Sequence, residues 1–219
     1  MIPDARGGPT GLGVTGAGAS PGWAFETIDA FLTELASGSP IPGGGAAAAL
    51  TGALAAALVG MVCRVAAGRD PSAPGRAEVA AAADELGRRL TALMREDVAA
   101  YGRVLEVGGL PADGRAAALG PALVNATDVP LEVGKCSGRV LALCDAVVQR
   151  APSRTLGDLG VAASLAWAAL EAGSLTARIN LRDISDERYV RASLAELNRL
   201  AVEGTALRER ISKVLAERV

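Results

Sequence analysis

A loop of prolines and glycines leads directly into a long run of small apolar residues between Ser39 and Gly60, with the sequence SPIPGGGAAAALTGALAAALVG. The two prolines favour an extended approach, and the glycines from Gly43 to Gly45 relax the steric limits on the backbone. The alanines and leucines that follow favour a helix. Its first N–H groups lack partners within the helix, so the loop predicts either a binding site for an anion or carbonyl group or a tight turn between two helices.

The same run is long enough to raise the question of a membrane span, because Ala46 to Cys63 comprises eighteen residues without a charge. However, the run is rich in alanine, has no flanking aromatic belt and ends at Arg64. A buried helix that packs closely through its small residues is therefore the preferred interpretation, and no membrane association is expected. Gly52 and Gly60 are the expected points of close helix approach.

The rest of the chain shows helical spacing of apolar residues and no convincing alternation of β-branched residues. We therefore predict an all-α fold, a helical bundle with long helices and a single domain over residues 23–219. Residues 1–22 are rich in glycine and proline, lack the order of a secretory signal and are expected to form a disordered extension. The expected helices are 23–36, about 44–68, 76–107, 113–125, 127–150, 160–173 and 185–218, the last one broken or bent near Gly204.

Composition excludes several classes of function. With 22 basic and 24 acidic residues the net charge is -2, which gives no reason to expect nucleic-acid binding. The chain has no histidine, so histidine triads and histidine-rich metal sites are excluded and no metal is expected. Its three cysteines, Cys63, Cys136 and Cys144, lack CxxC spacing and are interpreted as reduced packing residues of a cytoplasmic protein.

Several polar residues interrupt the apolar helices and are candidates for chemistry. Glu96, Asp97 and Tyr101 lie in one helix, where Asp97 and Tyr101 are four residues apart and share a face. Asp158 lies where a loop meets a helix beside two glycines. Taken alone, the first group is also compatible with a solvated helix face and Asp158 with an N-cap.

A second polar group follows the Gly160 helix, in the segment ARINLRDISD from Ala177 to Asp186. Arg178 and Asn180 could recognise a carboxylate or an amide, and Asp183 could pair with either. Ordinary surface charge is the competing interpretation. Neither group identifies a reaction by itself.

Five segments together resemble the formiminotransferase-cyclodeaminase family in order and spacing. They are PGGGAAAALTGALAAALVGMV, REDVAAYGRVL, ATDVPLEVGKCS, DLGVAASLAWAALEAG and ARINLRDISD, and the resemblance covers roughly residues 23 to 200. It is to the standalone cyclodeaminase/cyclohydrolase domain. The resemblance implies an all-helical, homodimeric enzyme that closes 5-formiminotetrahydrofolate with loss of ammonia or hydrolyses 5,10-methenyltetrahydrofolate, with no cofactor besides the folate substrate.

The resemblance also implies roles for individual residues. Both reactions involve a delocalised cation, which a buried carboxylate can stabilise while it relays a proton. By motif match, Asp97 and Asp158 are the expected catalytic carboxylates. The substrate is expected to contact the following residues: Gly43, Gly44, Gly45, Glu96, Tyr101, Arg178 and Asn180.

The chain departs from the family pattern at three places. Ala46 stands where the family commonly has serine, Arg95 stands where an acidic residue is usual, and the loop before Asp158 has the sequence APSRTLG. Two alternatives therefore accompany the folate enzyme. One is an enzyme of the same fold that acts on another small substrate in specialised metabolism, and the other is a non-catalytic dimeric binding protein.

Overall fold

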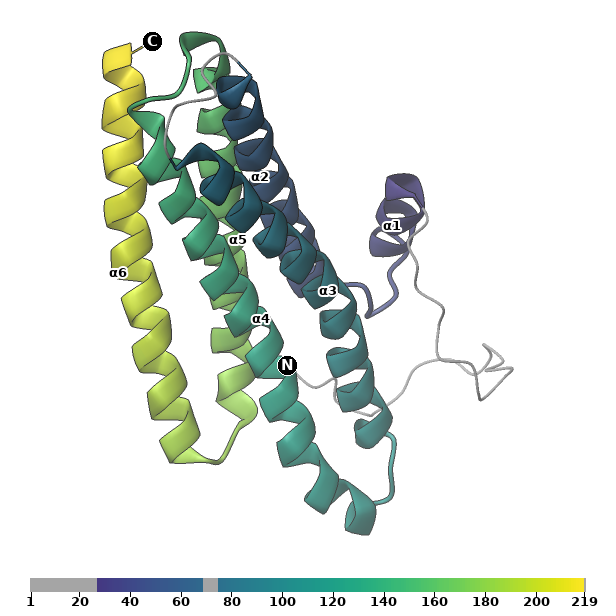
Figure 1. The fold of residues 1–219 in the computed structure, drawn as a ribbon. Coiled ribbons are helices and arrows are strands. Elements are labelled where there is room, and N and C mark those ends of the chain that lie inside the picture. The colour runs from purple at the N-terminus through teal and green to yellow at the C-terminus, as the bar shows by residue number, and fades with distance from the viewer. Residues whose placement is uncertain (1–26, 69–74, 219) are drawn as a thin grey trace.

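The computed structural model describes residues 27–68 and 75–218, and within these ranges it contains helices and no strands (Figure 1). The all-α prediction is confirmed. The helices are α1 (Ile28–Leu35), α2 (Gly44–Ala67), α3 (Arg76–Gly108), α4 (Ala112–Val148), α5 (Leu156–Asn180) and α6 (Glu187–Arg218), with two 3-10 turns, η1 (Ser153–Thr155) and η2 (Leu181–Asp183). The predicted extension 1–22, the start of the first predicted helix and most of the turn before Arg76 lie outside the described residues.

Helices α2 to α5 form a bundle in which each helix runs antiparallel to the next along the chain (Figure 1). Helix α5 also packs beside α2, which closes the ring of four, and α6 covers α4 and α5. Long antiparallel helices joined by short connections produce this arrangement because each one buries an apolar stripe against its neighbours.

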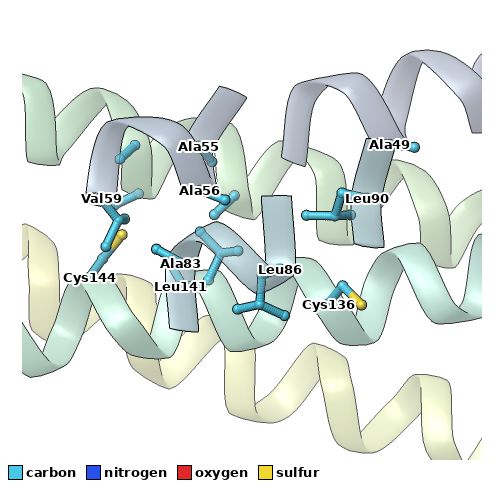
Figure 2. Close-up of a cluster of buried hydrophobic side chains, with 14 of the residues drawn as sticks. Ala49, Ala55, Ala56, Val59, Ala83, Leu86, Leu90, Cys136, Leu141 and Cys144 are labelled. Carbon is cyan, nitrogen blue, oxygen red and sulfur yellow. The ribbon is translucent and has the colours of Figure 1, made fainter. Parts of the chain in front are cut away.

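The core consists of small side chains from α2 interleaved with larger ones from α3 and α4. Figure 2 shows Ala55, Ala56 and Val59 facing residues of the other two helices, among them Leu86 and Leu141. The predicted close approach at Gly52 is confirmed, because a Cβ atom there would lie 2.8 Å from Ser137 Oγ and 3.1 Å from a Leu90 methyl. At Gly60 a Cβ would instead meet the end of the long Arg64 side chain at 2.8 Å, which can shift more readily than backbone, so this glycine is under weaker restraint.

The prediction of two helices over residues 113–150 was wrong, because α4 is continuous through Pro121 and Pro130. A proline inside a helix cannot donate to the carbonyl four residues earlier. For Pro130 that carbonyl belongs to the buried Ala126, and Asn180 Nδ2 donates to it at 2.6 Å. A side chain from α5 therefore replaces the hydrogen bond that Pro130 cannot make.

Two further helix boundaries differ from the predictions. Helix α5 starts at Leu156 and ends at Asn180, well beyond the predicted 160–173 at both ends. Helix α6 is not broken at Gly204, where a Cβ would lie 2.9 Å from both Trp167 and Leu170. The glycine at 204 allows α6 to approach α5 closely and does not interrupt the helix.

Two stretches of the described chain are long and apolar enough to cross a membrane, namely α2 and Ser153–Asp183. In their most apolar windows 56% and 44% of the residues are buried inside the bundle. Core helices of globular proteins also meet this criterion, so the finding agrees with the predicted core role of α2. A substantial apolar part of both helices nevertheless remains uncovered.

Candidate active site at the start of helix α2

The carboxylate of Asp97 lies against the first turn of α2, where it accepts a hydrogen bond from the Ala46 N–H. The N-cap residue Gly43 provides no side-chain cap, so Asp97 caps α2 from the neighbouring helix. A Cβ atom on Gly45 would overlap the Asp97 carboxyl group. Glycine at position 45 therefore makes room for the carboxylate.

The three loop glycines, Gly43 to Gly45, differ in how much space surrounds them. None of them has a positive φ, since Gly38 and Gly75 are the described glycines that do. A Cβ on Gly44 would meet nothing within 4 Å, and one on Gly43 would make ordinary contact at 3.7 Å. The N–H groups of Gly44 and Gly45 have no hydrogen-bond partner among the described residues, so they are available to a ligand.

Burial raises the pKa of Asp97 to about 6, although the hydrogen bond from Ala46 acts in the opposite direction. A carboxyl group with such a pKa can take up or release a proton near neutral pH. The carboxylate also faces the positive end of the α2 dipole and open N–H donors. These features suit general acid–base chemistry on a ligand bound at the start of α2.

Tyr101 lies one turn from Asp97 on α3 and is 40% exposed. Glu96, by contrast, forms an ion pair with Arg89 on the same helix. The expected grouping of Asp97 and Tyr101 on one face agrees with the structure. Glu96 lies on a different face.

Arg178 and Asn180 are occupied by contacts within the protein. Arg178 donates to the Asn198 side chain on α6 at 2.8 Å, and Asn180 donates to Ala126 on α4. Asn180 lies at the same end of the bundle as Asp97, because α2 begins and α5 ends there. In this structure Asn180 supports α4, a role that its sequence context does not reveal.

Replacing Asn180 with alanine should lower the free energy of unfolding by about 1–3 kcal/mol, because the buried Ala126 carbonyl would lose its partner. The control Arg178→Ala removes a surface contact and should change stability by about 0.5 kcal/mol or less. Urea unfolding of both variants measures the difference. Unchanged stability of Asn180→Ala would contradict this supporting role.

Asp158 lies in the first turn of α5, is exposed and has no hydrogen bond or ion pair within the described chain. Helix α5 starts where α2 ends, so Asp158 lies at the opposite end of the bundle from Asp97. Helix α2 alone is about 36 Å long at 1.5 Å per residue. The two expected catalytic carboxylates therefore do not meet within this chain.

Cys63, Cys136 and Cys144 are buried and free. Burial raises the pKa of Cys136 to about 11 and that of Cys144 to about 12, so both remain thiols at neutral pH. Within the described residues, no group of three or more acidic or cysteine side chains could hold a metal ion.

Comparison with known proteins agrees with the fold and the motifs. The family model described as formiminotransferase-cyclodeaminase matches residues 27–199. A methenyltetrahydrofolate cyclohydrolase of Methylorubrum extorquens is 36% identical over 89% of this chain and 98% of its own length. The chain therefore belongs to the formiminotransferase-cyclodeaminase family, as its sequence motifs predicted.

Other relatives contain the same domain, either as part of a longer protein or as most of the chain. The formimidoyltransferase-cyclodeaminase of Mus musculus is 28% identical over 74% of this chain, which spans only 32% of that longer protein. The crystal structure of a formiminotetrahydrofolate cyclodeaminase from Thermotoga maritima matches with a TM-score of 0.80 at 25% identity, and covers 87% of this chain and 96% of the other.

Proposed function

We propose that this protein is a folate-dependent one-carbon enzyme that hydrolyses 5,10-methenyltetrahydrofolate. The relative from Methylorubrum extorquens supports this choice, since it carries that activity in its name and matches over 98% of its length. The structural observation that carries the proposal is the Asp97 carboxyl group, with its pKa raised to about 6 beside open N–H donors of α2.

The proposed reaction uses Asp97 in two ways. Its carboxylate stabilises the methenyl cation and accepts a proton from the attacking water as oxygen bonds to the methenyl carbon. The resulting tetrahedral centre loses one of its two C–N bonds, and the protonated carboxyl returns the proton to the departing nitrogen. The hydroxyl oxygen of the tetrahedral centre becomes the formyl carbonyl, and its proton is released to solvent, which balances the positive charge of the substrate. The product is a formyltetrahydrofolate, and the cycle needs no cofactor besides the folate.

The first turn of α2 suits the binding of polar atoms of the substrate. The N–H groups of Gly44 and Gly45 point out of the helix start and would donate to a carbonyl or carboxylate oxygen. Tyr101 offers an exposed ring and hydroxyl one turn away. We assign these three residues to substrate binding.

Cyclisation of 5-formiminotetrahydrofolate with release of ammonia is the second candidate reaction. It is favoured by the structural match to the cyclodeaminase of Thermotoga maritima. The two reactions share a tetrahedral carbon between the same two nitrogens, so Asp97 could serve either. Release of ammonia from the formimino substrate distinguishes them.

The test is the ultraviolet absorbance of 5,10-methenyltetrahydrofolate with and without the protein. We expect the absorbance to decay faster with the protein, in proportion to its concentration. An unchanged rate of hydrolysis and cyclisation, together with no calorimetric binding of reduced folates, would contradict the proposal. The alternatives would then be another small substrate on the same scaffold or a non-catalytic binding protein.

We further propose that the protein is a cytoplasmic homodimer, as its family resemblance implies. Free buried cysteines are typical of a reducing compartment. The apolar surface left uncovered on α2 and α5 suits contact with another protein surface.

A further inference from the structure

A groove of about 350 Å³ lies between α4 and α6, with α5 beneath it. The candidate active site, by contrast, lies between α2 and α3. The floor of this α4–α6 groove is apolar and consists of Leu170, Leu200 and Leu207. Two glycines, Gly138 and Gly204, also line the groove and add no side chain to it. Its volume is at the lower end of the range for ligand sites, so the groove suits a small molecule.

Charged residues of the two helices form opposite walls of the groove. They are Glu132, Lys135 and Arg139 on α4 and Glu196, Arg199 and Glu203 on α6. Spacings of three, four and seven residues keep each set on one face of its helix. The α4 wall therefore carries a surplus positive charge, and the α6 wall carries a surplus negative charge.

The ion pairs that the described residues form on these walls stay within one helix. Lys135 pairs with Glu132 at 3.5 Å. Arg199 pairs with Glu196 at 2.7 Å and with Glu203 at 2.6 Å, so two carboxylates share one guanidinium. The surplus charges of the two walls are not neutralised by each other.

Arg139 and Glu203 lie at the same level along the bundle. Helices α4 and α6 run in the same direction (Figure 1), and Arg210 on α6 donates to Asp145 on α4 at 2.9 Å. Arg139 precedes Asp145 by about 9 Å, and Glu203 precedes Arg210 by about 10 Å, at 1.5 Å per residue. Arg139 is exposed and forms no hydrogen bond or ion pair within the described chain. A free guanidinium and a carboxylate thus lie on opposite walls at one level.

Contacts that do cross between α4 and α6 lie at the two ends of the groove. Arg210 contacts Asp145 at one end, and the Tyr189 hydroxyl donates to Asp128 at 2.7 Å at the other. Between them the walls interact only at longer range. The pKa of Glu196 is lowered, chiefly by its hydrogen bond with Arg199 and also by the charge of Lys135 across the groove. The two helices are therefore joined at both ends of the groove and leave it open between them.

A ligand that fits this charge distribution carries both signs. The α6 carboxylates would repel a simple anion, and Lys135 and Arg139 would repel a simple cation. A free α-amino acid carries one carboxylate and one ammonium group. The Arg139 guanidinium can donate two parallel hydrogen bonds to the carboxylate, and Glu203 can accept from the ammonium group. An apolar side chain would then cover the leucines of the floor.

We propose that the α4–α6 groove binds a free α-amino acid with an apolar side chain, held between Arg139 and Glu203. The site is separate from the candidate active site, so the proposal does not depend on the proposed reaction. Leu170 of the floor lies against both Gly138 and Gly204. The backbone amides of these two glycines therefore report occupation of the groove.

The proposal is tested by calorimetric titration of the full chain with L-leucine. We expect one site per chain with a dissociation constant in the millimolar range or below. N-acetyl-leucine lacks the ammonium group and leucinamide lacks the carboxylate, so each should bind at least about tenfold more weakly. Arg139→Gln and Glu203→Gln should each weaken leucine binding by a similar factor. The matched controls are Lys213→Gln and Glu209→Gln, which neutralise exposed charges on α6 outside the groove and should leave the affinity unchanged.

Nuclear magnetic resonance provides a second measurement on the wild-type chain. Leucine should shift the amide signals of Gly138 and Gly204. No heat and no shift with leucine, isoleucine or phenylalanine at up to about 10 mM would overturn the proposal. Equal binding of N-acetyl-leucine, or unchanged affinity in both groove variants, would also overturn it. Tighter binding of the dipeptide leucyl-leucine than of leucine would show that the ligand is not a free amino acid.

Discussion

Replacing Asp97 with asparagine should lower kcat/KM for methenyltetrahydrofolate hydrolysis by about 100- to 10,000-fold, the range that general acid–base catalysis contributes. Asparagine keeps the shape of the side chain and an oxygen that can accept from the Ala46 N–H, so the start of α2 should remain capped. It cannot accept a proton from water or balance the charge of the methenyl cation. The loss should therefore appear in catalysis and not in folding.

The pH dependence of wild-type activity should follow the protonation of Asp97. Because burial raises the pKa of Asp97 to about 6, the carboxylate that acts as base is lost as the pH falls through 6. Activity at pH 5 should thus be well below that at pH 7. The Asp97→Asn variant should lack this transition.

The free energy of unfolding should decrease as the pH rises, whereas the activity should increase. The folded protein holds the Asp97 proton more tightly than the unfolded chain does, because the pKa of Asp97 is about 6 in the folded state and near 3.8 in the unfolded chain. Between these values the folded state binds more protons, so stability falls as the pH rises toward 6. Asp97→Asn should remove this part of the dependence, measurable as the difference in unfolding free energy between pH 4 and pH 7.

The matched control for these experiments is Glu106→Gln, which neutralises an exposed carboxylate on the same helix. It should leave the rate and its pH profile unchanged. Full activity of Asp97→Asn, or a pH profile identical to that of the wild type, would show that Asp97 is not the catalytic carboxylate.

Replacing Gly173 with alanine should destabilise the fold by about 3 kcal/mol, toward the upper end of the range for overpacking. A Cβ there would lie 2.8 Å from the Pro130 carbonyl oxygen and 3.0 Å from the Gly134 nitrogen. Both atoms belong to the backbone of α4, so they cannot move aside as a flexible side chain would. For a chain of this length the melting temperature should fall by about 6–12 °C.

Gly157→Ala on the same helix provides the control. A Cβ at that position meets nothing within 4 Å, and alanine is the better helix former, so stability should be unchanged or higher. Differential scanning calorimetry compares the two. Equal melting temperatures for Gly173→Ala and the wild type would show that α4 and α5 are not held in this close contact.

The sequence predicted the fold class and the glycine-rich start of α2 correctly, because both depend on local pattern. Long runs of small and apolar residues favour helices wherever they occur, and glycines before such a run predict an open helix start. The sequence was misleading at Pro130, where a proline near the first turn predicted the start of a new helix, whereas α4 is continuous there. The missing hydrogen bond is supplied by Asn180, which is fifty positions later in the chain and could not be paired with it by local reasoning.

The amino-acid sequence by itself determined that the chain is helical, that α2 is built for close packing and that the family is the formiminotransferase-cyclodeaminase family. The tertiary structure decided which candidate residues lie close together. Asp97 lies at the start of α2, and Asp158 lies at the opposite end of the bundle. Glu96 pairs with Arg89, and Arg178 donates to Asn198. The reason is that helix periodicity assigns a residue to a face, whereas the order and direction of the packed helices decide which faces and ends meet.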